Sequence, residues 1–146
     1  MKIAEVMTRN PQAIGPHESL RQAAELMDTL DVGILPVCDG RDLVGVITDR
    51  DITVRATAAG EAPDTTTVAE AMTDEVRWCF ADDDVREAER VMRRTQIRRV
   101  PVLDRSRRLV GMLSLGDLAG KAARDVRDTL DMISQPPTPD RPAAPR

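Results

Sequence analysis

The stretch LVGVITDRDI, residues Leu43 to Ile52, recurs later in the chain as LVGMLSLGDL, residues Leu109 to Leu118. Each copy is an apolar run that leads to a hydroxyl residue and, three positions further on, to an aspartate: Thr48 with Asp51, and Ser114 with Asp117. This pattern predicts a buried strand that runs directly into the start of a helix.

The hydroxyl residue of each copy has two interpretations. The first backbone N–H groups of a helix have no partner within the helix, so Thr48 and Ser114 are expected to cap those groups. The same end of a helix carries partial positive charge and can bind an anion. One copy alone would favour the cap. Because the motif occurs twice at one spacing, we also expect Asp51 and Asp117 to contact a ligand.

The duplication extends beyond these two stretches. Met7-Thr8 recurs as Met72-Thr73, and Pro36-Val37 recurs as Pro101-Val102, both 65 positions later. From Leu43 onward the offset is 66, so one residue is added in the turn between two predicted strands. A turn tolerates such a change. The chain is therefore expected to consist of two repeats with internal pseudo-two-fold symmetry.

Hydrophobic spacing and turn signals predict the same elements in both repeats. In the first repeat they are a short helix over Ile3–Met7, an extended piece near 12–14, a helix capped by Ser19 with Gln22, strands over Ile34–Cys38 and Leu43–Thr48, and a helix from Asp49 to Ala59 that ends at Gly60. In the second they are a helix over Val68–Met72, a strand over Val76–Phe80 with Trp78 in the core, a helix capped by Asp84 with Glu87, strands over Arg99–Leu103 and Leu109–Leu113, and a helix over Leu115–Ile133 whose last turns carry Val126, Leu130 and Ile133.

These elements divide the chain into four segments. Residues 1–60 form the first repeat, 61–67 a polar connector, and 68–134 the second repeat. Residues 135–146 are rich in proline and have almost nothing to bury, which predicts a disordered tail.

Composition argues against several classes of protein. The 146 residues carry a net charge of −4, which disfavours a general affinity for nucleic acid or an anionic membrane. No apolar run spans a bilayer and no signal-peptide core is present, so a cytoplasmic location is expected. His17 is the only histidine, and Cys38 and Cys79 lack metal-ligand spacing, so no metal site and no catalytic residues are expected. Both cysteines are expected to be buried free thiols, with a disulfide between them left open.

Taken together, each repeat has a short helix ending in Met-Thr, a strand, a helix, a Pro-Val strand, and a closing strand of the form Gly-apolar-apolar-[Ser/Thr]-x-x-Asp. Occurring twice in this order, over about residues 3–130, these signatures resemble a tandem pair of CBS (cystathionine-β-synthase) domains. The arrangement is most similar to small stand-alone bacterial CBS-pair proteins of the hypoxic-response type. The resemblance implies an α/β (α+β) fold of two pseudo-symmetric βαββα repeats packed through their sheets.

The resemblance also implies a cleft for an adenosine-containing ligand: AMP, ADP, ATP or S-adenosylmethionine. In that family the aspartate binds the ribose hydroxyls, the hydroxyl residue faces the phosphates, and the backbone before Pro-Val meets the adenine. Carried over to this chain, one site comprises Thr48, Asp51, Leu35 and Pro36, and the other comprises Ser114, Asp117, Val100 and Pro101.

The two implied sites differ in charge. Arg50 lies between Thr48 and Asp51, either as a phosphate partner or as an ordinary surface or ion-pair residue. The corresponding Leu115-Gly116 is uncharged, and Arg98 and Arg99 are expected to supply positive charge to the second site. We therefore expect at most one strong site, or two sites of different preference.

These expectations lead to a regulatory module that requires no cofactor and signals through a homodimer or an unidentified protein partner. The alternative is an interaction module that binds no ligand. An enzyme is the least supported reading, because no nucleophile–histidine set and no phosphate-binding Walker loop are present.

Overall fold

The computed structural model describes residues 1–120 and 130–134. The first part of the chain forms a short 3₁₀ turn η1 (Ile3–Glu5), β1 (Thr8–Arg9), α1 (Leu20–Leu30), the hairpin β2 (Ile34–Asp39) and β3 (Asp42–Thr48), then α2 (Asp49–Asp51) and the π-helical turn η2 (Ile52–Thr57). The second part repeats this order as α3 (Val68–Ala71), β4 (Cys79–Phe80), α4 (Val85–Thr95), β5 (Arg99–Leu103), β6 (Leu109–Ser114) and α5 (Leu115–Ala119). Residues 130–134 are also helical.

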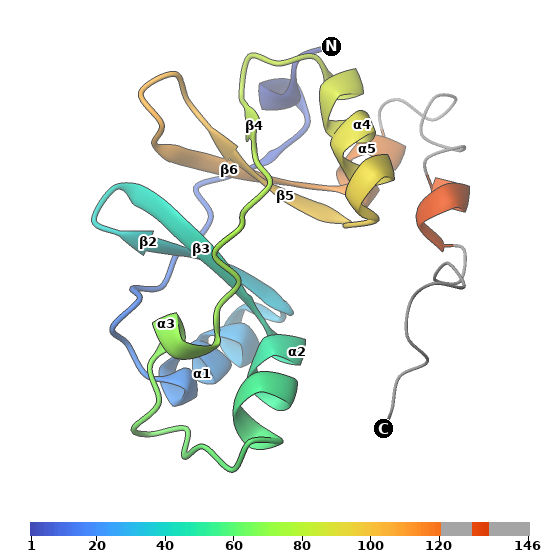
Figure 1. Ribbon diagram of the computed structural model, residues 1–146. Coiled ribbons are helices and arrows are strands. Elements are labelled where there is room, and N and C mark those ends of the chain that lie inside the picture. The colour runs from blue at the N-terminus through green and yellow to red at the C-terminus, as the bar shows by residue number, and fades with distance from the viewer. Residues whose placement is uncertain (121–129, 135–146) are drawn as a thin grey trace.

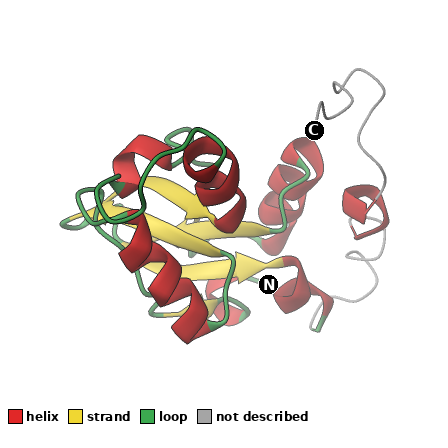
Figure 2. Ribbon diagram, turned by 90° about the horizontal axis from the view of Figure 1, so that it is seen from below, coloured by secondary structure: helices red, strands yellow, loops and turns green. Residues whose placement is uncertain are grey.

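The strands form two sheets that lie between the helices. One sheet has the order β1-β6-β5-β4, and the other is the antiparallel hairpin of β2 and β3. Figure 1 shows the two sheets next to each other, with α1, α2 and α3 on the side of β2 and β3, and α4 and α5 on the side of β5 and β6. The perpendicular view shows the same strands enclosed by helices (Figure 2). The predicted fold class is confirmed.

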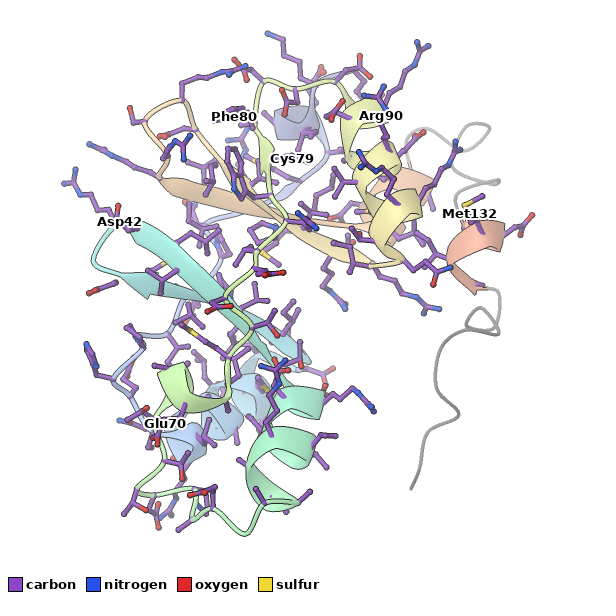
Figure 3. The ribbon with its side chains drawn as sticks, in the orientation of Figure 1. Asp42, Glu70, Cys79, Phe80, Arg90 and Met132 are labelled. Carbon is purple, nitrogen blue, oxygen red and sulfur yellow. The ribbon has the colours of Figure 1, made fainter. Side chains whose placement is uncertain are left out.

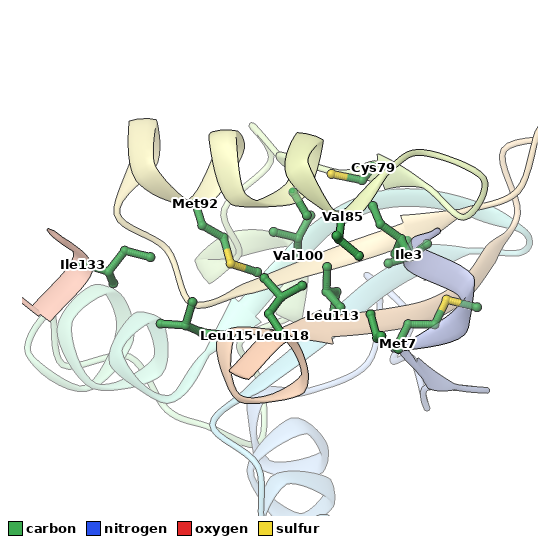
Figure 4. Close-up of a cluster of buried hydrophobic side chains, with 13 residues drawn as sticks. Ile3, Met7, Cys79, Val85, Met92, Val100, Leu113, Leu115, Leu118 and Ile133 are labelled. Atoms are coloured by element: carbon green, nitrogen blue, oxygen red, sulfur yellow. The ribbon is translucent and has the colours of Figure 1, made fainter. Parts of the chain in front are cut away.

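The two hydrophobic cores do not follow the division of the sequence into repeats. The core of the first sheet contains Leu20, Leu35 and Ile47 together with Val68 and Ala71, which come from the second repeat. The core of the second sheet contains residues of α4, β5 and β6 together with Ile3, Val6 and Met7, which come from the N-terminus (Figure 4). Each core is therefore completed by the short helical segment at the start of the other repeat.

The Met-Thr segments make this exchange possible. Thr8 of β1 pairs with Met112 of β6, and Thr73 exchanges two backbone hydrogen bonds of 2.9 Å with Val46 of β3. Beside each contact lies a glycine of the repeated motif, Gly111 or Gly45, which brings the two backbones close together. A Cβ atom on Gly45 would lie 2.8 Å from the Thr73 carbonyl oxygen. The motif needs glycine at this place because no side chain fits.

The expected helix caps are confirmed in the first repeat and differ in the second. Ser19 and Gln22 form the reciprocal capping box at the start of α1. Asp84 caps α4 by accepting a hydrogen bond of 2.9 Å from the Arg86 backbone N–H. No reciprocal bond from Glu87 accompanies it in the described structure of α4. A short carboxylate at the cap position is sufficient by itself for one of the free N–H groups.

The predicted strand over Val76–Phe80 is shorter, and its core-facing side is the opposite one. Only Cys79 and Phe80 form β4, and Cys79 is the buried residue (Figure 3). Trp78 is half-buried outside the core, 4.8 Å from the Phe80 ring centroid, and the guanidinium of Arg107 lies over it. The prediction that Trp78 belongs to the core was wrong, because its ring packs against the Arg107 guanidinium and, edge to face, against Phe80 instead.

Two predicted helices also differ. The helix from Asp49 to Ala59 changes after Asp51 into a π-helical turn, where the Ala58 N–H bonds to the Thr53 carbonyl. It ends before Gly60, whose φ of +79° agrees with the expected terminal glycine. Of the helix over Leu115–Ile133, residues 121–129 lie outside the described part, including Val126; Ile133 is buried in the second core and Leu130 is exposed. The tail from residue 135 also lies outside it.

The two cysteines are free thiols that differ in accessibility, which predicts selective labelling. Burial, with Asp83 and Glu87 nearby, raises the pKa of the Cys79 thiol to about 12, and burial beside Asp42 raises the pKa of the half-buried Cys38. Because the thiolate is the reactive form, a disulfide reagent at pH 8 should label Cys38 in the folded protein and both cysteines in urea. Peptide mass spectrometry would identify them; equal rates in the folded protein would contradict this assignment.

Candidate ligand clefts

Both repeated stretches end in the same capped turn. The Asp51 N–H donates to the Thr48 hydroxyl at 3.0 Å, and the Thr48 N–H donates to the Asp51 carboxylate at 3.0 Å. The second copy has the same pair of bonds between Ser114 and Asp117, at 3.0 and 2.9 Å. The cap interpretation is therefore confirmed for both hydroxyl residues. It also holds each aspartate in one fixed position at the end of a buried strand.

Each aspartate keeps capacity for a further partner. A carboxylate has two oxygens and about four lone-pair sites, of which the capping bond uses one. The other oxygen of Asp51, Oδ1, lies 3.8 Å from Nε of Arg55, and Arg55 also donates to the Met72 carbonyl at 3.0 Å. Asp51 is only 9% exposed. A buried carboxylate oriented from two sides is suited to accept hydrogen bonds from a ligand.

Asp51 lines the larger of two clefts between the sheets, which we name the first cleft. It has a volume of about 700 Å³, within the range of small-molecule sites. The turn from β3 into α2 contributes one wall, with Thr48, Arg50 and Asp51. The opposite wall comes from the second repeat and includes Arg77, Arg98, Arg99 and Pro101.

Asp117 lines the second cleft, with a volume of about 420 Å³. Its walls are Ser114 and Asp117 at the end of β6, Leu35 and Pro36 of β2, and the N-terminal segment from Thr8 to Gln12. Arg9 and Arg99 are its two arginines, and Leu30, Val32 and Met112 contribute apolar surface. The two clefts therefore differ in size and in their arginines, four in the first and two in the second, and Asp49 and Glu75 of the first cleft offset its two additional positive charges.

The structure regroups the predicted site residues. Thr48, Arg50 and Asp51 share a cleft with Arg99 and Pro101, whereas Ser114 and Asp117 share one with Leu35, Pro36 and again Arg99. Leu35 thus lines the cleft of Asp117 rather than that of Asp51, and Arg98 lines the cleft of Asp51. Sheet packing places the end of one motif opposite the Pro-Val strand of the other repeat. Val100 lines neither cleft, because its side chain is fully buried in the second core.

Sequence reasoning missed one group of lining residues. The segments that follow the Met-Thr pairs reach the clefts, with Arg9 to Gln12 in the second cleft and Glu75 to Arg77 in the first. The signal that could have revealed them is the repeated Met-Thr beside a repeated glycine. That combination indicates a close backbone contact between the segment and the motif strand.

Within the described ranges, 1–120 and 130–134, no group of three or more His, Cys, Asp or Glu side chains could hold a metal ion. In the same ranges no helix has the length and apolar character needed to cross a bilayer.

These features define a class: a tandem α/β module with two clefts between its repeats, each closed by a capped aspartate turn. The sequence model of the CBS domain matches residues 3–56 and 68–124. The chain is 39% identical over 116 residues to Hypoxic response protein 1 of Mycobacterium tuberculosis, which covers 79% of this chain and 80% of that protein. The chain belongs to the CBS-domain family and is a CBS-pair module of the regulatory, signal-transduction kind.

Solved structures agree with this assignment. Hypoxic Response Protein I with two coordinated zinc ions matches with a TM-score of 0.77 at 36% identity, covering 83% of this chain and 98% of that one. A putative signal-transduction protein with CBS domains from Burkholderia ambifaria matches with a TM-score of 0.75 at 27% identity, over 85% and 96%. CBSX2 in complex with AMP matches with a TM-score of 0.73 at 26% identity, over 85% and 97%.

Proposed function

We propose that this chain is a sensor that binds an adenosine-containing ligand, AMP, ADP, ATP or S-adenosylmethionine, in the clefts between its repeats. The observation that carries the proposal is the pair of capped aspartates, each facing a cleft of ligand size whose walls also carry arginines. A carboxylate can accept from two neighbouring ribose hydroxyls, and guanidinium groups can bind phosphates. The AMP complex of CBSX2 supports this ligand class.

The two clefts favour different ligands. The first cleft has Arg50, Arg77, Arg98 and Arg99 on its walls, which suits a ligand with several phosphates. The second cleft is smaller and has two arginines, Arg9 and Arg99, which suits a ligand with fewer phosphates. In this proposal the chain acts without catalysis and needs no cofactor.

The sensor is expected to signal in one of two ways. It changes the geometry of a homodimer, or it binds a separate protein partner. Helices α1 and α4 occupy equivalent places in the repeats, yet exposed Glu25 of α1 corresponds to exposed Arg90 of α4. Opposite charge on equivalent helices allows α1 of one copy to face α4 of another. Light scattering over a range of protein and salt concentrations measures this association.

The free thiols Cys38 and Cys79 support the proposed cytoplasmic location.

Calorimetric titration with AMP, ADP, ATP and S-adenosylmethionine tests the ligand, and Asp51→Asn and Asp117→Asn test the site. Asparagine keeps an oxygen that can accept the capping bond from Thr48 or Ser114, but it loses the charge and the second acceptor oxygen. We expect each substitution to weaken binding in its own cleft at least about tenfold, the size of a charge-assisted hydrogen bond.

The matched control is Asp64→Asn, at an exposed aspartate in the connector that lines neither cleft. It should leave all affinities unchanged. If the wild-type chain gives no heat with any of the four ligands, the sensor proposal is wrong and the ligand-free interaction module becomes the better account.

A further inference from the structure

Two residues line both clefts, Ile34 and Arg99. They occupy equivalent positions of the two repeats, 65 residues apart. Each pairs across its hairpin with the capping residue of its own repeat: Ile34 with Thr48, and Arg99 with Ser114. These two positions therefore lie where the clefts adjoin. In the first repeat the position is apolar, and in the second it carries a guanidinium group.

The side chain of Arg99 is free to serve either cleft. It is exposed, and in residues 1–120 and 130–134 its guanidinium has no hydrogen bond or ion pair within the chain. By contrast, Arg55 and Arg105 are held by Asp51 and Asp82. A long cationic side chain without a fixed partner moves to the anion that is present.

From this geometry we propose that the two clefts compete for the single guanidinium of Arg99, so that an anion bound in one weakens the binding of an anion in the other. The inference rests on the proposed ligand function and adds a coupling between its two sites. When the first cleft captures Arg99 it still has three further arginines, whereas the second cleft is left with Arg9 alone. The positive charge of the second cleft therefore depends more on Arg99 than that of the first cleft does.

The size of the effect follows from one shared contact. By linkage, each ligand weakens the other by the same factor. Loss of one guanidinium–phosphate contact corresponds to about a tenfold change in affinity. An uncharged ligand makes no use of Arg99, so the coupling must be absent for adenosine. The inference thus predicts coupling that depends on ligand charge.

The test is a calorimetric titration of the full chain with ATP and, separately, with adenosine. The affinity of the second cleft is measured in the wild-type chain after the first cleft is filled, and in Asp51→Asn at ATP concentrations that leave the weakened first cleft empty. For ATP we expect the second cleft to bind about tenfold more tightly in Asp51→Asn than in the filled wild-type chain. For adenosine we expect no difference. If the wild-type chain binds one ATP only, Asp51→Asn must still bind ATP in the second cleft.

Two variants identify Arg99 as the cause. Arg99→Ile copies the residue of the equivalent position, so the second-cleft affinity for ATP should no longer depend on whether the first cleft is filled. Ile34→Arg supplies a second guanidinium at the junction, and both clefts should then bind ATP tightly at the same time. Thermal unfolding confirms that each variant is folded.

The outcomes separate this inference from the function on which it rests. Binding of ATP with second-cleft affinities that are equal in the wild-type chain and Asp51→Asn overturns the competition for Arg99 and leaves the sensor intact. Coupling that persists in Arg99→Ile, or that is equally strong for adenosine, also overturns it. Absence of any binding of ATP and adenosine to the wild-type chain overturns the sensor proposal together with this inference.

Discussion

Replacing Gly45 by alanine is expected to lower the free energy of unfolding by about 3 kcal/mol, at the upper end of the usual cost of overpacking a close contact. The added Cβ would lie 2.8 Å from the Thr73 carbonyl oxygen and 2.7 Å from Sδ of Met72. The methionine can move, but the carbonyl is held by its hydrogen bond from Val46 at 2.9 Å. The substitution must therefore push the Met72-Thr73 segment away from β3. Urea unfolding measures the loss, and the melting temperature should fall by about 10 °C.

Gly116→Ala is the matched control. This glycine lies in α5, and its Cβ would approach the Ser114 hydroxyl oxygen no closer than 3.6 Å. Alanine also favours a helix over glycine by about 1 kcal/mol. Gly116→Ala should therefore be neutral or slightly stabilising. A change of less than about 0.5 kcal/mol for Gly45→Ala, the usual range for surface substitutions, would show that the close contact of the two segments is not required.

Truncation of Ile3 to alanine is expected to destabilise the chain by about 3 kcal/mol, although the residue lies next to the N-terminus. Ends of chains are usually tolerant of change, but Ile3 is 0% exposed and belongs to the core formed by α4, β5 and β6. Its backbone N–H also donates to the Asp83 carbonyl at 2.9 Å, which docks the turn against the second repeat. Removing its side chain leaves a cavity in a core that is distant in sequence.

Val54→Ala serves as the control, because Val54 is an aliphatic residue of the first repeat that is 41% exposed. It should change the free energy of unfolding by less than about 0.5 kcal/mol. Hydrogen exchange locates the effect of Ile3→Ala: amides of α4, β5 and β6 should lose protection before those of α1 and β2. Loss of protection confined to α1 and β2 would contradict the placement of Ile3 in the second core.

The exchange of short helices between the cores has a consequence for folding. Each core needs a segment from the other repeat, Ile3 to Met7 in one case and Val68 to Ala71 in the other. Neither repeat can complete its core alone, so the two halves depend on each other. The CBS-domain model matches residues 3–56 and 68–124, but neither range contains all the residues of one hydrophobic core.

The candidate site was predicted in part. The aspartates, the hydroxyl residues and the arginine between them were found from one short motif, because capping chemistry and strand-to-helix spacing are local. The partners across each cleft were not found, because Leu35 contacts the cleft of Asp117 only through sheet packing. Trp78 was misplaced for a related reason: alternation along a strand identifies two faces but does not say which one is covered.

The sequence alone was sufficient to predict the local features of this protein. The duplicated motif, the Met-Thr and Pro-Val pairs and the capped turns are all set by neighbours within a few positions, since backbone hydrogen bonding and helix capping act over that range. Tertiary packing alone decided which repeat completes which core, which Pro-Val strand faces which aspartate, and that Arg99 adjoins both clefts. These pairings join residues far apart in sequence. They follow from the burial of apolar surface between sheets and helices, and because the hydrophobic effect is non-directional, the order of residues does not specify which surfaces meet.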